Sequence, residues 1–183
     1  RIETIQDVLM YSDINYKLQY EEDSRNIIIT LGDSSKPKLV IGAHYDIFGT
    51  SMGINDNGIA VALLIHFAIN LKKNNSNKQI EIVLFDKEEQ GAIGSYDYIN
   101  RNITVIQEAI ILDIIGYGEE ILLSGTMSKT DMMQQLYGAK ELRFGLPSDN
   151  VNFERYSIPV TLITGAARED IFINLEGTYD VRP

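Results

Sequence analysis

Apolar residues fall along the chain in short blocks with two different spacings. Four near-continuous apolar runs, rich in β-branched residues, are typical of strands covered on both faces: residues 38–43, 80–85, 109–112 and 160–163. Between these runs, residues 57–73 carry apolar side chains at positions i, i+3 and i+4, which predicts a helix, and residues 90–100 predict a second one. Strands that alternate with helices indicate right-handed crossovers and a largely parallel sheet.

The remaining segments add further elements around this pattern. Residues 15–20 and 25–31 predict a strand pair at an antiparallel edge, and the further predictions are helices at 2–11 and 129–139 and a strand at 121–123. We therefore expect an α/β fold in which residues 1–183 form a single domain. It should have three α/β/α layers, a mostly parallel central sheet and antiparallel edge strands.

Composition narrows the class of protein. The 183 residues include 16 Lys and Arg against 26 Asp and Glu, a net charge of −10, which argues against nucleic acid as a partner. The absence of cysteine excludes disulfides, Cys-based zinc sites and thiol nucleophiles. No uninterrupted apolar run reaches the roughly 18–20 residues of a membrane helix, so we expect no membrane contact. No signal peptide is present, which favours a cytoplasmic location, although the missing initial Met leaves a trimmed secreted form open.

One imidazole and several carboxylates stand just past the predicted strands. Because the carboxyl ends of parallel strands meet at one edge of a sheet, these side chains should lie together there. Each has a simpler interpretation: a helix cap for Asp56, acids in a first helical turn for Glu88 and Glu89, and turn or strand-end residues for the others. Several acids at one edge would nevertheless repel one another unless a cation lay among them. The group comprises His44, Asp46, Asp56, Glu88, Glu89 and Asp113.

The spacing within this group fits a metal site. Positions 44 and 46 point to the same side of an extended strand, so Asp46 can accept a hydrogen bond from the imidazole of His44. A carboxylate behind a metal-bound His is a common arrangement. Glu88 and Glu89 are adjacent and should point in different directions, so that one can bind metal while the other acts as a general base.

With these residues in view, the sequence resembles the zinc-dependent aminopeptidases of the M28 family over roughly residues 37–183. No single motif is specific, but all of them occur in the family's order. The motifs are Gly42-Ala43-His44-Tyr45-Asp46, Gly53-Ile54-Asn55-Asp56-Asn57-Gly58, Phe85-Asp86-Lys87-Glu88-Glu89-Gln90-Gly91 with Gly94-Ser95, Leu112-Asp113-Ile114-Ile115-Gly116, Ser148-Asp149 with Phe153, and Ile158-Pro159-Val160.

The resemblance implies a role for each acidic position. His44 and Asp113 resemble the ligands of one metal, and Asp56 resembles the carboxylate that bridges two metals. Glu89 matches a ligand of the other metal and Glu88 matches the general base. Asp46 matches the acid that orients the ligand His.

The C-terminal part departs from the family pattern. The last ligand of the family is usually a His four residues before an Asp; Asp180 matches that Asp, but the ligand position is Glu176. The other histidine, His66, lies inside the predicted helix and is interpreted as an ordinary helix residue. Leu175, just before the ligand position, cannot donate the oxyanion hydrogen bond usual in the family. The family also continues into another helix, whereas this chain ends at Pro183, so a missing C-terminal segment is an open alternative.

The ligand sets that the resemblance implies predict unequal metal sites. The set of His44, Asp56 and Asp113 keeps its imidazole and should hold zinc, whereas the all-oxygen set of Asp56, Glu89 and Glu176 suits harder divalent ions. We expect one or two Zn²⁺ ions, the second site being weak or taking another divalent metal.

The resemblance implies an aminopeptidase that acts on peptides with a free N-terminus through metal-activated water. Two alternatives stay open. One is a catalytically weak or inactive binding or regulatory protein on the same scaffold. The other is an enzyme similar to glutaminyl cyclases, which use a single metal. The sequence leaves side-chain specificity and oligomeric state undetermined.

Overall fold

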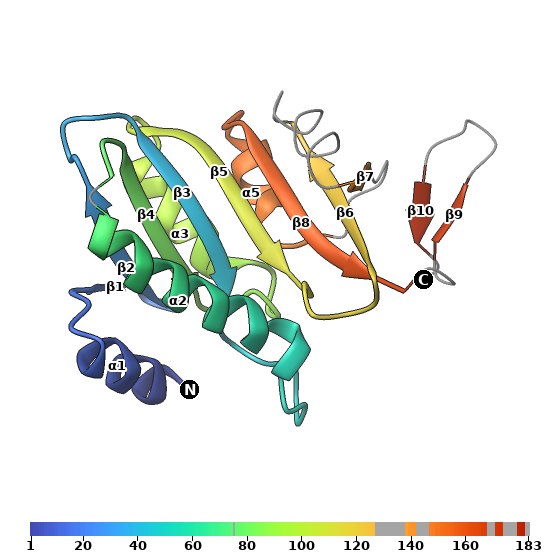
Figure 1. The fold of residues 1–183 in the computed structure, drawn as a ribbon, viewed down its shortest axis with the longest axis horizontal. Coiled ribbons are helices and arrows are strands. Elements are labelled where there is room, and N and C mark those ends of the chain that lie inside the picture. Colours follow the sequence, from blue (N-terminus) through green and yellow to red (C-terminus); the bar gives the residue numbers. More distant parts are fainter. Residues whose placement is uncertain (75, 127–137, 142–146, 168–170, 174–178, 182–183) are drawn as a thin grey trace.

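The computed structural model describes residues 1–74, 76–126, 138–141, 147–167, 171–173 and 179–181. A twisted sheet runs through the described part, with helices against both of its faces (Figure 1). The strands are β1 (Lys17–Tyr20), β2 (Arg25–Gly32), β3 (Lys38–His44), β4 (Gln79–Phe85), β5 (Ile106–Asp113), β6 (Glu120–Gly125), β7 (Lys140–Glu141), β8 (Val160–Ala166), β9 (Ile171–Ile173) and β10 (Tyr179–Val181).

Eight strands form the main sheet in the order β1-β2-β4-β3-β5-β8-β6-β7. Its centre, β4-β3-β5-β8, is parallel throughout. The pair β1 and β2 adds the antiparallel edge that the sequence predicts. On the other side β6 runs antiparallel to β8, and β9 pairs with β10 in a separate two-stranded sheet.

Helices form the two outer layers. The helical elements are α1 (Ile2–Tyr11), η1 (Ile54–Gly58), α2 (Ile59–Asn74), α3 (Ile93–Asn102) and α5 (Asn150–Arg155). One core cluster joins α1 and α2 to one face of the sheet through side chains such as Leu9 and Leu64. A second cluster joins α3 and α5 to the opposite face through Tyr98 and Phe153. The predicted three-layer α/β fold is therefore confirmed.

Two helices begin later than the sequence predicts, for a local reason in each case. The helix predicted at 57–73 starts at Ile59, because Asp56 and Asn57 have non-helical backbone angles. The helix predicted at 90–100 starts at Ile93, because Gly91 and Ala92 take left-handed conformations. The helix predicted at 129–139 lies almost wholly outside the described residues.

The stretch Ile54–Asn74 is long and apolar enough, by length and composition alone, to cross a membrane. The sequence contains no uninterrupted apolar run here, because polar residues such as His66 lie between the apolar ones. A core helix passes the same test, and α2 packs on the sheet through Leu64 and Ala68. This stretch is therefore only weak support for a membrane span.

A buried ion pair lies where β3 and β4 begin. Lys38 Nζ is 2.9 Å from Glu81 Oε1 and donates to Asn102 Oδ1 at 3.0 Å. Tyr98 donates its hydroxyl proton to the second oxygen of Glu81 at 2.6 Å. We call these four residues the Lys38 network; it joins β3, β4 and α3 by charge and hydrogen bonds.

Candidate metal centre

The carboxyl ends of three neighbouring parallel strands carry the candidate ligands. His44 is the last residue of β3 and Asp113 the last residue of β5, while Glu88 and Glu89 follow the end of β4. Register places His44 opposite Phe85, so the loop after β4 starts beside the imidazole. Asp56 reaches the same edge from η1, which leads into α2. The edge predicted from the order of strands is therefore the edge at which these side chains meet.

The side chains converge on the imidazole of His44, which is 1% exposed. Its Nε2 atom lies 3.0 Å from Asp56 Oδ1, 3.4 Å from Asp113 Oδ1 and 4.0 Å from Glu88 Oε2. Two groups have ligand atoms that all lie within 4.8 Å of one another: His44 with Asp56 and Asp113, and His44 with Glu88 and Glu89. The structure thus brings together all five residues, while their individual roles stay predictions.

Asp46 supports three of these groups at once. Its Oδ1 lies 3.2 Å from His44 Nδ1 and accepts the backbone N–H of Glu88 at 3.0 Å. Its Oδ2 accepts the backbone N–H of Glu89 at 3.1 Å. These contacts leave Nε2 of the imidazole turned toward the carboxylates, and they hold the loop after β4 against the end of β3.

A buried amide fixes the turn that carries Asp56. Asn57 is fully buried, and its side chain donates to the backbone carbonyl of Leu112 at 2.8 Å. The peptide bond between Asp56 and Asn57 is cis. Because Leu112 directly precedes Asp113, this hydrogen bond places Asp56 next to Asp113. The sequence analysis assigned Asn57 no such role.

Burial and neighbouring charges shift the pKa values of His44, Glu88, Asp56 and Glu89. Burial lowers the pKa of His44, but the adjacent carboxylates of Asp113 and Asp46 outweigh this effect and raise the pKa to about 11. Burial raises the pKa of Glu88 to about 7, with the charges of Asp113 and Glu89 contributing and the charge of His44 opposing the shift. Burial also raises the pKa values of Asp56 and Glu89. Excess negative charge in a poorly solvated place is the common cause.

The residues fit a divalent cation. Among the described residues, buried atoms without a hydrogen-bond partner include His44 Nε2, Glu89 Oε1 and Asp113 Oδ1. Nε2 of His44 is close to Asp56, yet the two do not align as a hydrogen bond. An imidazole nitrogen and carboxylate oxygens that converge on one point are the donor set of a zinc or similar divalent site once the imidazole releases its proton. Asp56, whose side chain is 45% exposed, leaves the group accessible from solvent.

Asp149 is a further acid that sequence reasoning noted only as part of a motif. It is fully buried just before α5, and neither of its carboxylate oxygens has a hydrogen-bond partner among the described residues. Burial raises its pKa well above the ordinary value, and the charges of Glu88 and Asp113 add to the shift. The Ser148-Asp149 motif was the available signal, but the six-residue helix α5 is too short for a periodic pattern to reveal its position.

The C-terminal predictions lie mostly outside the described residues. These include Glu176 as a ligand and Leu175 before it, so Glu176 stays a prediction. Asp180 belongs to β10. His66 is an exposed residue of α2, which agrees with its interpretation as an ordinary helix residue.

Comparisons with known proteins agree with this architecture. The family profile described as Peptidase family M28 matches residues 26–179. The aminopeptidase YwaD of Bacillus subtilis is 35% identical over 87 residues, which are 44% of this chain and 18% of that protein. This chain therefore spans less than a fifth of that relative's length.

Solved structures share the fold at low sequence identity. A zinc aminopeptidase from Bacillus subtilis superposes with a TM-score of 0.69 at 24% identity, covering 79% of this chain and 41% of the other. A glutaminyl cyclase from an Acidobacteriales bacterium superposes with a TM-score of 0.73 at 17% identity, covering 90% of this chain and 69% of the other. At these identities the likeness concerns the fold alone.

Proposed function

The chain belongs to peptidase family M28, and from this premise we propose that it is a metal-dependent aminopeptidase that uses zinc. The observation that carries the proposal is the convergence of His44, Asp56 and Asp113 around one buried imidazole nitrogen, with Glu88 next to them. Substrates in this proposal are peptides with a free N-terminus. The aminopeptidase relative supports this class of reaction.

Two overlapping sets of ligands hold metal in this proposal. His44, Asp56 and Asp113 form the first set, whose imidazole favours zinc. Asp56 and Glu89 form the second with Glu176, and an all-oxygen set favours harder ions such as Mn²⁺. The first site therefore retains zinc firmly, while the second exchanges its metal or stays partly filled.

Glu88 is the general base of the proposed reaction. When bound, zinc lowers the pKa of a neighbouring water from about 15.7 toward about 7 and polarises the scissile carbonyl. Glu88 accepts a proton from the attacking water and later returns it to the leaving amine. Burial raises the pKa of Glu88 in the metal-free protein, which favours a carboxyl group that can hold a proton between these two steps.

The other residues orient the ligands and the substrate. Asp46 accepts a hydrogen bond from Nδ1 of His44, which keeps Nε2 free to bind metal. The excess of carboxylates attracts the α-ammonium of a peptide. This attraction favours cleavage next to a free N-terminus over cleavage inside a chain.

The test combines metal analysis with substrate assays. The protein is dialysed, its zinc is counted, and it is then assayed with amino-acid p-nitroanilides and dipeptides in the presence of Zn²⁺, Mn²⁺ or Co²⁺. N-acetylated versions of the same substrates are the matched control. We expect one retained zinc, and hydrolysis only of substrates with a free N-terminus.

Each other result has a distinct meaning. Two equivalents of tightly held zinc contradict the unequal sites, and cleavage of acetylated substrates contradicts aminopeptidase action. Cyclisation of N-terminal glutamine without hydrolysis supports a glutaminyl cyclase, a function that the cyclase-like fold makes worth testing. Metal binding with no turnover of any substrate supports a non-catalytic protein.

A single substitution addresses the altered ligand position. Glu176→His restores the imidazole usual in the family, so we expect zinc retention at the second site to rise. Glu176→Gln is the control, because it keeps the size of the side chain and removes its charge. Equal zinc content in all three proteins would exclude residue 176 from the ligand set.

A further inference from the structure

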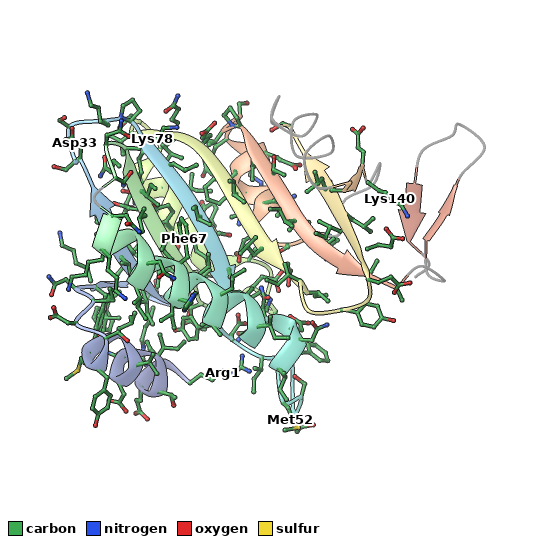
Figure 2. All side chains as sticks on the ribbon, viewed as in Figure 1. Arg1, Asp33, Met52, Phe67, Lys78 and Lys140 are labelled. Atoms are coloured by element: carbon green, nitrogen blue, oxygen red, sulfur yellow. The ribbon has the colours of Figure 1, made fainter. Side chains whose placement is uncertain are left out.

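The side chain of Arg1 contacts the loop that connects two parts of the proposed metal centre. This loop runs from Asp46, behind His44, to Asp56 in η1. Figure 2 shows Arg1 at the start of α1 beside the loop whose tip carries Met52. The guanidinium of Arg1 contacts the backbone at both ends of this loop, and no carboxylate partner is recorded for it among the described residues.

The contacts of Arg1 divide between the two ends of the loop. Its Nη1 donates to the carbonyl of Tyr45 at 3.1 Å and to that of Asp46 at 3.5 Å. Its Nη2 donates to the carbonyl of Met52 at 2.9 Å and also to that of Gly53. One planar group thus joins the segment after β3 to the segment before Asp56. The fork of an arginine can make such a bridge, whereas a lysine has a single nitrogen.

Gly53 is adapted to this approach. Its φ of 57° is left-handed, and a Cβ atom there would lie 2.5 Å from Nη2 of Arg1. The carbonyl of Gly53 also accepts the backbone N–H of Gly58 at 3.0 Å, within the turn that carries Asp56. Arg1 therefore contacts Gly53, the residue at which the turn carrying Asp56 begins.

The tip of the loop has little packing of its own. Phe48 is 69% exposed and Met52 is 80% exposed, so both lie largely in solvent, whereas Ile47 is 37% exposed and lies against Gly53. Arg1 directly precedes α1, and this helix is anchored to the core by the buried side chains of Ile5 and Leu9. The helix can therefore hold the loop through the guanidinium.

We propose that Arg1 is a positioning residue for the metal centre: by bridging the two ends of the loop, it sets the distance from His44 and Asp46 to Asp56. This inference rests on the proposed function, because it concerns ligands of the proposed metal. Arg1 itself touches neither substrate nor metal. Its loss widens the distribution of Asp56 positions, and metal affinity falls because fewer molecules have the ligands together.

The experiment measures zinc affinity in the full chain with Arg1→Ala, Arg1→Lys and the control Arg101→Ala. Arg101 is an exposed arginine of α3 that pairs with Glu21 away from the ligands. Metal is removed with a chelator, zinc binding is followed by calorimetry, and melting temperatures are recorded with and without zinc. The metal-free melting temperatures separate a loss of fold from a loss of ligand spacing.

We expect Arg1→Ala to weaken zinc binding by about tenfold or more, the range found when groups that orient ligands are removed. Arg101→Ala should bind as the wild type does, and the metal-free melting temperatures of the two variants should be similar. Arg1→Lys should fall between Arg1→Ala and the wild type, since it keeps charge but contacts fewer carbonyls.

Two results overturn the inference while leaving the proposed function intact. In one, Arg1→Ala binds zinc within about twofold of the wild type. In the other, Arg1→Lys binds as the wild type does although Arg1→Ala is weakened, which would make charge and not the bridge responsible. A wild-type protein that binds no zinc at all instead contradicts the proposed function, and that failure is visible before any variant is made.

Discussion

Strand β3 is buried at both ends, but its two ends lie in opposite electrostatic environments. It begins at Lys38 and ends at His44, about 20 Å further along at the usual rise of a strand. At Lys38 one ammonium faces one carboxylate; Tyr98 donates to the carboxylate and Asn102 accepts from the ammonium. At His44 one imidazole lies within 4.0 Å of four carboxylates.

The difference separates a polar cluster that supports the fold from one that needs a ligand. Among the described residues, every charged group of the Lys38 network has a partner, so the network is complete without further atoms. At the His44 end, buried atoms of His44, Glu89 and Asp113 find no hydrogen-bond partner in the part of the chain that the structure describes. A buried polar atom without a partner lowers the stability of the fold, so such atoms indicate a site at which a bound ligand supplies the partner.

The largest expected effect is on turnover. Glu88→Gln removes the proposed base from the His44 end and should lower kcat by about a thousandfold, within the range for loss of a general base. Zinc content should stay unchanged, because Glu88 is not assigned as a ligand. Steady-state assays and metal analysis of the same preparation measure both quantities.

A loss of zinc in that variant would reassign Glu88 as a ligand. The matched control is Glu81→Gln, an identical exchange in the Lys38 network. It should lower stability while the remaining folded protein keeps its kcat.

The next largest effect is on the stability of the fold, and it arises at the Lys38 end of β3. Lys38→Met leaves Glu81 buried without its cation and should reduce the free energy of unfolding by about 3–5 kcal/mol. Chemical denaturation followed by circular dichroism gives this value. The double variant Lys38→Met/Glu81→Leu should recover most of the loss, since it removes both charges. A single variant as stable as the wild type would show that the pair is not essential to the fold.

Zinc should act on one end of β3 only. At a free zinc concentration about 100 times the Kd, binding should stabilise the fold by about 2.7 kcal/mol. His44→Ala should remove this effect, whereas Lys38→Met/Glu81→Leu should retain it. Denaturation curves with zinc and with a chelator provide the comparison. A zinc effect that persists in His44→Ala would locate the site elsewhere.

The smallest expected effect is a pH dependence of the free energy of unfolding in the metal-free protein. The pKa of Glu88 is raised from 4.5 to about 7, chiefly by burial, so the folded state binds this proton more tightly than the unfolded state does. The free energy of unfolding therefore falls as pH rises between these two values. Glu88→Gln lacks this loss and should gain on the order of 2 kcal/mol over the wild type above pH 7, after allowance for solvent screening.

Denaturation at several pH values in the presence of chelator tests this. A difference between the two proteins that does not change with pH would mean that Glu88 titrates normally.

The sequence was informative where short-range patterns decide the structure. Buried runs at 38–43 and 80–85 predict strands, and parallel order then predicts that His44, Glu88 and Asp113 share an edge. The antiparallel edge at 15–31 was also correct. These features depend on residue type and chain order alone.

Features that depend on distant pairs were out of reach. Lys38 begins one apolar segment and Glu81 interrupts another, but only the pairing of β3 with β4, which places Lys38 two positions from Glu81 in register, makes them partners. Asn57 gains its role through a carbonyl 55 positions away, at Leu112. Asp149 directly precedes α5, and a helix of six residues leaves too little pattern for its position to be predicted.

The contacts of Asp46 limit how the candidate metal centre can be redesigned. Its two oxygens serve an imidazole and two peptide N–H groups, so all three neighbours require an acceptor. Asparagine has nearly the same shape, but it would turn an NH₂ group toward at least one of them. The position thus tolerates no neutral stand-in, and an engineer who wishes to change metal preference would do better to vary the turn around Asp56.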